Sequence, residues 1–211
     1  MNLEARPQPL PAVLRTAVPW KNGGGLTREV AAAPEGAALG EFDWRVSTAE
    51  VRSAGPFSIF PGVQRTLCVL EGRLALEVEG APAVRLAPDS APYVFSGDLP
   101  AHARPGPEAV VDLNIMTRRG RFGARVAPVE FTATVVRTSG AGVTLIFACA
   151  ALTVTTPAAA YQLARWDALK VTGATACTLA AAGGQGACYF IEIAAQGRGL
   201  IGGTRAGGQG S

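Results

Sequence analysis

Short stretches in which apolar and polar residues alternate run along most of the chain and predict β-strands. The clearest covers residues 42–51, where a period of two places Arg45 and Ser47 on the same face. Residues 110–116 alternate in the same way and place Asp112 and Asn114 on one face. Further strands are expected near residues 1–19 (with a proline-rich lead), 27–33, 64–70, 84–86, 93–95, 125–136, 143–149, 151–155, 159–163, 168–172, 175–180 and 187–194. Short strands at this spacing, with frequent Gly and Pro turns, are typical of an all-β fold.

The segments between these strands are rich in turn residues. We expect loops at residues 54–62 (AGPFSIFPG) and at residues 96–109 (SGDLPAHARPGPEA), and the second of these places His102 in a loop. The sequence RTLCVLEGRLALEVEG, residues 65–80, predicts a β-hairpin that turns at Glu71-Gly72. Residues 164–170 (ARWDALK) are the only short candidate for a helix.

Predicted strands recur at similar spacing in the two halves of the chain, which indicates a duplicated β-barrel or jelly roll. A strand pair, a proline turn and a short aromatic strand, in that order, are typical of one cupin barrel. We therefore expect an all-β bicupin, with two jelly-roll-like barrels of the RmlC-like cupin type in one chain. Residues 1–121 would form the first barrel and residues 122–196 a smaller second one, with the N-terminal strand able to cross over. The glycine-rich residues 197–211 would be a flexible tail.

Composition excludes disordered and membrane-spanning proteins. The 211 residues are 48% hydrophobic and 17% charged, which is typical of a globular protein. The longest apolar runs, such as residues 143–152, have about half of the roughly 20 residues that a membrane-spanning helix needs. The N-terminus carries an acid and several prolines where a signal peptide has a cationic start and an apolar core. We expect a cytoplasmic protein.

The low net charge argues against nucleic-acid binding, and the charged residues are unevenly distributed along the chain. A net charge of +3 is too weak to indicate a nucleic-acid-binding surface. Arg118, Arg119 and Arg121 have no aromatic residues between them and are expected to form a solvated rim. Most of the 19 basic and 16 acidic residues precede residue 122. The charge-poor second part must bury its apolar surface against the first part or against a second subunit, so a homodimer is one expectation.

Cysteine and histidine usage argues against metal sites and disulfides. The four cysteines, Cys68, Cys149, Cys177 and Cys188, are widely spaced and form no C-x-x-C pair, which favours buried free thiols. His102 is the only histidine, and one histidine cannot build the multi-histidine centre of metal-dependent cupins. The sequence also contains no nucleophile motif and no P-loop. We expect no metal, no cofactor and no assigned catalytic residue.

A glycine-rich stretch, WKNGGGLTRE at residues 20–29, is the first candidate for a binding site. It places conformationally permissive backbone beside several hydrogen-bond donors, which suits a bound anion or polar ligand. The alternative is a glycine-rich loop that merely leads into the next strand. The residues that would bind a ligand here are Lys21, Asn22, Thr27 and Arg28.

An arginine-centred set on the predicted strands is the second candidate. It consists of Arg45, Ser47, Arg65, Asp112 and Asn114. If all five point into one cavity, a pair between Arg45 and Asp112 would leave Arg65 and the neighbouring polar groups to bind a carboxylate. Arginine suits this role because its planar fork can contact both carboxylate oxygens. The alternative is a structural salt bridge between Arg45 and Asp112, with Arg65 on the surface. Phe57 and Phe60 are expected to pack the barrel end rather than a ligand.

Five motifs in one order carry a family resemblance. They are residues 20–29 (WKNGGGLTRE), 42–49 (FDWRVSTA), 55–65 (GPFSIFPGVQR), 70–72 (LEG) and 112–119 (DLNIMTRR). Together they resemble the HutD/Ves family over roughly residues 14–121, with a weaker likeness near 183–190 (GGQGACYF). The resemblance implies a bicupin fold, a cytoplasmic location, a link to histidine utilisation and a small acidic ligand such as N-formylglutamate or formate. It implies no established enzymatic activity.

Three functional hypotheses follow. The leading one is a metal-free bicupin that binds a small carboxylate metabolite and modulates histidine utilisation without catalysing a reaction. The second is a metal-independent cupin enzyme, an isomerase or hydrolase, with Asp112 or His102 as the proton-transfer group. The third is a structural or protein-interaction module whose barrel is filled by apolar side chains.

Overall fold

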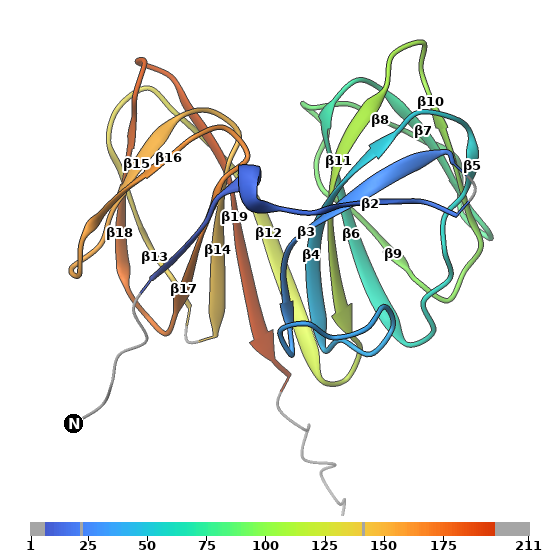
Figure 1. Cartoon of the computed structure of the whole chain (residues 1–211), viewed down its shortest axis with the longest axis horizontal. Coiled ribbons are helices and arrows are strands. Elements are labelled where there is room, and N and C mark those ends of the chain that lie inside the picture. Colours follow the sequence, from blue (N-terminus) through green and yellow to red (C-terminus); the bar gives the residue numbers. More distant parts are fainter. Residues whose placement is uncertain (1–6, 22, 141, 197–211) are drawn as a thin grey trace, which may run out of the picture.

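The computed structural model describes residues 7–21, 23–140 and 142–196, and these residues form two β-barrel-like halves side by side (Figure 1). Every strand pair is antiparallel, and one short 3-10 helix, η1 (Ala12–Leu14), is the only helix in the described part of the chain. The all-β prediction is confirmed. Among these residues no helix has the length and apolar character to cross a membrane.

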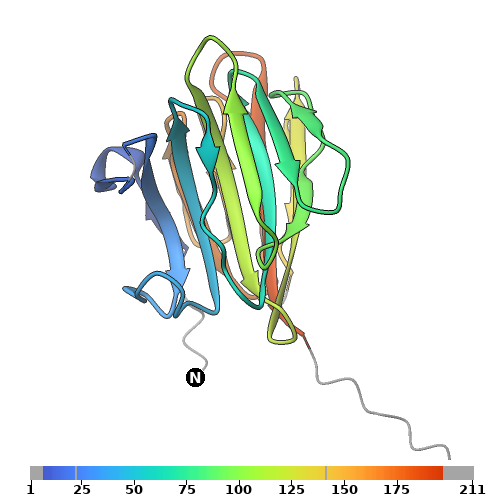
Figure 2. The same cartoon turned by 90° about the vertical axis from the view of Figure 1, so that its right-hand side faces the viewer.

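The first half consists of two facing sheets, and Figure 2 shows the molecule with this half toward the viewer. One sheet has the order β2-β3-β4-β11-β6-β9 and the other β5-β10-β7-β8. The strands are β2 (Ala17–Pro19), β3 (Gly25–Ala33), β4 (Trp44–Val51), β5 (Gly55–Pro56), β6 (Val63–Glu71), β7 (Leu74–Val78), β8 (Val84–Leu86), β9 (Tyr93–Ser96), β10 (Ala101–Pro105) and β11 (Val110–Arg118). Apolar side chains from both sheets, including Leu67, Leu76 and Ala103, form a core between them.

The expected hairpin over residues 65–80 is wrong. Strand β6 pairs with β9 and β11, whereas β7 pairs with β8 and β10 in the other sheet. The chain changes sheets at Gly72, whose φ of 76° belongs to the left-handed region. A Cβ atom at this position would lie 2.9 Å from the carbonyl oxygen of Ala109. The alternation of side chains marks each strand but does not identify its partner.

Two other local expectations are also wrong. Residues 101–105 form β10 rather than a loop, so His102 lies on a strand, paired with Glu77 of β7 and Pro56 of β5. The surrounding Pro and Gly residues are turn signals, but they flank the strand instead of interrupting it. The candidate helix at residues 164–170 is a turn that contains Trp166 at a φ of 71° and then enters β17.

The second half is a smaller pair of sheets with an apolar interior. Its sheets have the orders β1-β17-β14-β19-β12 and β13-β18-β15-β16. The strands are β1 (Gln8–Leu10), β12 (Phe122–Phe131), β13 (Val135–Thr138), β14 (Val143–Ala148), β15 (Leu152–Thr155), β16 (Ala160–Leu163), β17 (Ala168–Thr172), β18 (Ala176–Ala181) and β19 (Gly186–Ala195). Thirteen buried residues fill the space between them, among them Phe131, Ile146 and Phe190. The Phe131 ring lies so close to Gly186 that an added Cβ would be 2.3 Å from it.

The largest sheets of the two halves pack against each other. Trp44, Val46 and Ile115 of the first half belong to one buried cluster with Phe147 and Ile191 of the second. The N-terminal segment also joins the halves, because β1 pairs with β17 and β2 pairs with β3 (Figure 1). Packing within the chain therefore covers part of the charge-poor second half. Burying apolar area of this kind stabilises the fold by roughly 25 cal/mol per Å².

The four cysteines are free thiols, as expected, and three of them are buried. Cys149 is partly buried. Burial raises the pKa of Cys68 and of Cys188 to about 12, so both thiols stay protonated at neutral pH. They act as small apolar side chains, Cys68 in the buried cluster between the two halves and Cys188 in the core of the second half.

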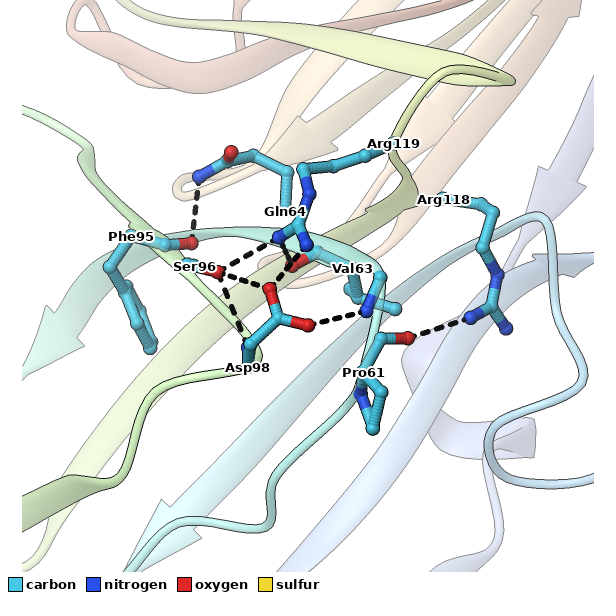
Figure 3. Close-up of polar contacts among 9 residues, drawn as sticks. Pro61, Val63, Gln64, Phe95, Ser96, Asp98, Arg118 and Arg119 are labelled. Carbon is cyan, nitrogen blue, oxygen red and sulfur yellow. Dashed lines mark hydrogen bonds and ion pairs between the residues drawn. The ribbon is translucent and has the colours of Figure 1, made fainter.

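The basic residues Arg118 and Arg119 at the end of β11 form hydrogen bonds to neighbouring loops (Figure 3). Arg118 donates to the carbonyl oxygens of Pro61, Gly40 and Phe42. Arg119 donates to the carbonyl oxygen of Val63 and to the side chains of Ser96 and Asp98. Hydrogen bonds from Ser96, the Gly62 N–H and Arg119 hold the pKa of Asp98 well below its usual range. The predicted rim is therefore a set of partnered side chains, which anchors the end of the aromatic segment 57–62.

Candidate functional site

A cavity of about 710 Å³ lies in the first half, which is the size of a small-molecule site. Its polar wall is the inner face of the sheet that contains β3, β4, β11 and β6. Its other walls are aromatic and apolar, and include Trp20, Phe57 and Phe60. Two apolar side chains that line the cavity, Val18 and Leu39, are more than half exposed and mark its mouth.

Strand register explains why the polar residues share this wall. Because side chains alternate across a strand, residues two apart along β4 and β11 face the same side. Three rows of neighbouring residues cross the sheet on the cavity side. They are Arg45–Met116–Arg65, Glu29–Ser47–Asn114 and Thr27–Ala49–Asp112. The pairing between β3 and β4 is irregular directly after Glu29, and such bulges change the direction of a side chain.

Arg65 lies at the end of the polar wall inside an aromatic cage. Its side chain is 4% exposed, and its guanidinium carbon lies 5.0 Å from the ring centres of Phe57 and Phe95 and 5.7 Å from that of Phe60. One Nη donates to the carbonyl oxygen of Ser58 at 3.3 Å, and the buried Nε has no partner among the described residues. The reading of Arg65 as a surface residue is therefore wrong. Phe57 and Phe60 surround the arginine as well as packing the barrel end.

Arg65 remains a cation in this setting. Burial lowers its pKa to about 10, and the negative charge of Asp112 opposes that shift. The phenyl faces attract the guanidinium through their quadrupoles, which offsets part of the cost of removing the charge from water. A buried cation with an unused donor, beside an open cavity, is suited to an anionic ligand.

Arg45 pairs with Glu29 and not with Asp112, which corrects the expected pair. Its Nε lies 2.8 Å from Glu29 Oε2, and the Arg45 side chain is largely buried. The irregular pairing after Glu29 keeps this carboxylate on the cavity face. Asp112 lies two rows further along the sheet, opposite Ala49. The Glu29 pair uses one of the five N–H donors of Arg45, so the guanidinium can also contact a ligand.

Asp112 is a carboxyl group with too few partners. It is 1% exposed, it accepts a backbone hydrogen bond from Ala49, and its Oδ1 has no partner among the described residues. Burial raises the pKa of Asp112 to about 7, because the loss of water outweighs the opposing effects of Arg65 and Ala49. Nearby, Asn114 Oδ1 is also buried and unpartnered in the described structure. Orphaned buried polar atoms are rare in native proteins and call for an explanation.

The glycine stretch forms one side of the mouth. Lys21 and Thr27 line the cavity, whereas Arg28 is not among its lining residues and Asn22 lies outside the described residues. Trp20 donates from its indole N–H to Thr27 Oγ1 at 2.8 Å and meets the Phe57 ring edge-on. Gly25 lies beneath the Trp20 ring. Gly23, whose φ is 71°, donates its N–H to the Trp20 carbonyl oxygen at 3.0 Å and so closes the turn that carries Trp20 and Lys21.

The structure brings together most of the candidate residues. Seven line one cavity: Lys21, Thr27, Arg45, Ser47, Arg65, Asp112 and Asn114. Their role as ligand contacts stays a prediction. Sequence reasoning missed Glu29 and Trp20, although both stand in the glycine stretch, and it missed the cage around Arg65. The aromatic residues of segment 54–62 were the available signal for that cage.

The donor set in the described part of the chain does not suit a metal. No three His, Cys, Asp or Glu residues there come together as a metal site. His102 is not among the residues that line the cavity. Two arginines and a lysine instead favour an anion, and Asp112 and Asn114 favour a ligand that also donates a hydrogen bond.

Comparison with known proteins gives a family match over most of the chain. The family model described as HutD matches residues 14–190. Protein Ves of Citrobacter koseri is 38% identical over 129 residues, which are 60% of this chain and 66% of that protein. An uncharacterised 21.2 kDa protein in the hutC 3' region of Pseudomonas putida is 33% identical over 159 residues, 74% of this chain and 82% of that protein.

Solved structures agree with the fold. HutD from Pseudomonas fluorescens SBW25, solved in a formate condition, superposes with a TM-score of 0.78 at 30% identity, over 91% of this chain and 100% of that one. A cupin 2 conserved barrel domain protein from Leptotrichia buccalis superposes with a TM-score of 0.57 at 7% identity, over 90% of this chain and 97% of that one. The second likeness shows the fold alone and confirms the cupin prediction.

Proposed function

The chain belongs to the HutD family, and on this premise we propose that it binds a small carboxylate metabolite in the cavity of its first half and thereby modulates histidine utilisation. The observation that carries the proposal is Arg65, a buried cation that lines the cavity and whose Nε has no partner among the described residues. A carboxylate there would accept hydrogen bonds from the guanidinium and neutralise a charge that is otherwise shielded from water.

The other cavity residues support the same class of ligand. Arg45 and Lys21 add positive charge, and Ser47 adds a hydroxyl group. Apolar walls at Trp20 and Phe57 suit the methylene groups of a short acid such as N-formylglutamate. Relatives supply the biological context, since one is named for its place in a hutC 3' region and another is HutD itself.

Calorimetric titration tests the proposal. Formate, N-formyl-L-glutamate, urocanate and L-glutamate are titrated separately into the protein, and at least one is expected to bind with a stoichiometry of one. Arg45→Ala should weaken that ligand about tenfold or more, because it removes a charged hydrogen-bond donor from the wall. Arg104→Ala is the matched control, since Arg104 is exposed on the opposite sheet and pairs with Glu77.

Two results would contradict the proposal. One is the absence of heat with all four compounds over a wide concentration range. The other is a ligand that binds the Arg45→Ala protein as tightly as the wild type and the control.

The second candidate function is a metal-independent enzyme, and Asp112 is the observation that favours it. A buried carboxyl group whose pKa is about 7, on the wall of a cavity, can take up and release a proton at neutral pH. His102 is not a candidate for this role, because it does not line the cavity. Proton NMR spectra of each ligand, incubated with the protein, separate the two functions: unchanged spectra support binding, and new signals that depend on Asp112 support catalysis.

The filled-barrel hypothesis fits the second half better than the first. Packed apolar side chains occupy the interior of the second half, whereas the first half contains the polar-walled cavity. We therefore place the ligand in the first half.

A further inference from the structure

We propose that the cavity takes up its carboxylate ligand together with one proton, which is bound by Asp112. The inference rests on the proposed carboxylate-binding function and adds a proton to it. It predicts that ligand occupancy depends on pH in the neutral range, although the ligand's own carboxyl group is ionised throughout that range.

The geometry of the free site leaves Asp112 poorly compensated. Its carboxylate accepts one backbone hydrogen bond, from Ala49, and within the described chain no Lys, Arg or His nitrogen lies within the 4.0 Å of an ion pair. Its Oδ1 has no hydrogen-bond donor among the described residues, and the Oδ1 of Asn114, on the same face of the sheet, also lacks one there. A simple carboxylate such as formate or glutarate brings further acceptor oxygens to this wall and no donor of its own. One added proton supplies the missing donor, as an O–H on Asp112.

The charged groups around Asp112 come from three strands of the polar sheet and from the turn before β3. They are Lys21 before β3, Glu29 on β3, Arg45 on β4 and Arg65 on β6. Glu29 and Arg45 largely cancel each other, since they form an ion pair. The Cys68 thiol on β6 is protonated, and the facing sheet turns the apolar side chains of Leu74, Leu76, Val78, Ala101 and Ala103 into the interior. Arg65 is the cation that opposes protonation of Asp112.

A bound carboxylate would reverse this balance. It would neutralise Arg65, which removes the charge that favours ionised Asp112, and it would place a second anion close to Asp112. Two carboxylates in one buried site share a proton rather than ionise together. Because the pKa of Asp112 in the free protein is about 7, the proton must come from solution when binding occurs above that pH. Binding should therefore be constant at lower pH and weaken as the pH rises above 7.

Calorimetry in buffers of different ionisation enthalpy measures the proton directly. Formate, glutarate and N-formyl-L-glutamate are the probes, and phosphate, HEPES and Tris are the buffers. At pH 8, the observed enthalpy plotted against buffer ionisation enthalpy should give an uptake of about one proton, and at pH 6 it should give almost none. The association constant should fall about tenfold between pH 7.5 and pH 8.5, because one proton is linked to binding.

Asp112→Asn removes the titrating group and keeps the shape of the side chain. This variant should still bind the probe, with no proton uptake at pH 8 and with no fall in affinity between pH 7.5 and pH 8.5. Glu77→Gln is the matched control, because Glu77 is exposed on β7 outside the cavity, and it should keep the wild-type proton uptake.

The outcomes separate the two proposals. Wild-type binding without proton uptake at pH 8, or undiminished uptake in Asp112→Asn, overturns the proton-linked mechanism and leaves carboxylate binding intact. Failure of every probe to bind between pH 5.5 and pH 8.5 overturns both. If circular dichroism shows that Asp112→Asn does not fold, the proton uptake of the wild type and of Glu77→Gln at pH 8, measured as the slope of observed enthalpy against buffer ionisation enthalpy, decides between the outcomes by itself.

Discussion

Replacing Arg65 by methionine is expected to abolish measurable carboxylate binding without lowering the stability of the fold. Methionine has a similar volume and suits the cage of Phe57, Phe60 and Phe95, but it carries no charge. The ligand then loses its principal cation, and we expect its affinity to fall roughly 100-fold or more. The free energy of unfolding should stay within about 1 kcal/mol of the wild type or rise, because a buried charge is costly to desolvate.

Calorimetry and urea unfolding at pH 7 measure these two effects on the same protein. Arg28→Met is the matched control: Arg28 stands in the glycine stretch but does not line the cavity, so binding should not change. Strong destabilisation of Arg65→Met would make the arginine a structural residue. Unchanged affinity would remove it from the ligand site.

Replacing Gly25 by alanine is expected to destabilise the protein by about 3 kcal/mol, because overpacking against backbone is costly. An added Cβ would lie 2.3 Å from the carbonyl oxygen of Glu50 and 3.2 Å from the Trp20 ring. Backbone cannot move aside as a flexible side chain can, so β3 must shift from β4 and Trp20 must leave its place beside Phe57. Ligand affinity should fall as well, since both Trp20 and Thr27 line the cavity.

The matched control is Gly183→Ala, a position where an added Cβ meets nothing within 4 Å. This change should alter the free energy of unfolding by less than about 0.5 kcal/mol, as for most surface substitutions. Urea unfolding compares both variants with the wild type, and tryptophan emission, to which Trp44 and Trp166 also contribute, should change when Trp20 is displaced. If the Gly25→Ala protein is as stable as the control, β3 and β4 must be further apart at Gly25 than the structure shows, and the prediction is contradicted.

The sequence was sufficient to predict most of the strands and the polar face of the cavity, but β10 was expected to be a loop. Alternation in residues 42–51 and 110–116 places Arg45, Asp112 and Asn114 on definite faces, because the period of a strand is two. The register of β4 and β11 then brings those faces onto one wall. To predict that these residues line one cavity, it was enough to know which strand face each occupies and that the strands form a barrel. Both follow from local sequence.

Pairing partners could not be predicted from the same pattern. Residues 65–80 alternate correctly, but the left-handed turn at Gly72 sends β7 into the other sheet. Arg45 pairs with Glu29 because of an irregularity in β3 that leaves no trace in the alternation. The cage around Arg65 combines Phe57 and Phe60 of one segment with Phe95 of β9, and no local signal places Phe95 beside the aromatic segment.

The charge-poor second half illustrates the same limit. Sequence composition required a covering surface for it, and the structure supplies one in the sheet of the first half that carries Trp44 and Ile115. A homodimer is therefore not needed to explain the composition. It stays a prediction that light scattering can test.

The measurement that tests the central claim most directly is a crystal structure grown with N-formyl-L-glutamate at saturating concentration. The claim predicts density for the ligand inside the cavity, with a carboxylate group within hydrogen-bonding distance, about 2.7–3.1 Å, of the Arg65 guanidinium. A cavity that contains only water under these conditions, or a ligand bound elsewhere on the protein, would contradict it.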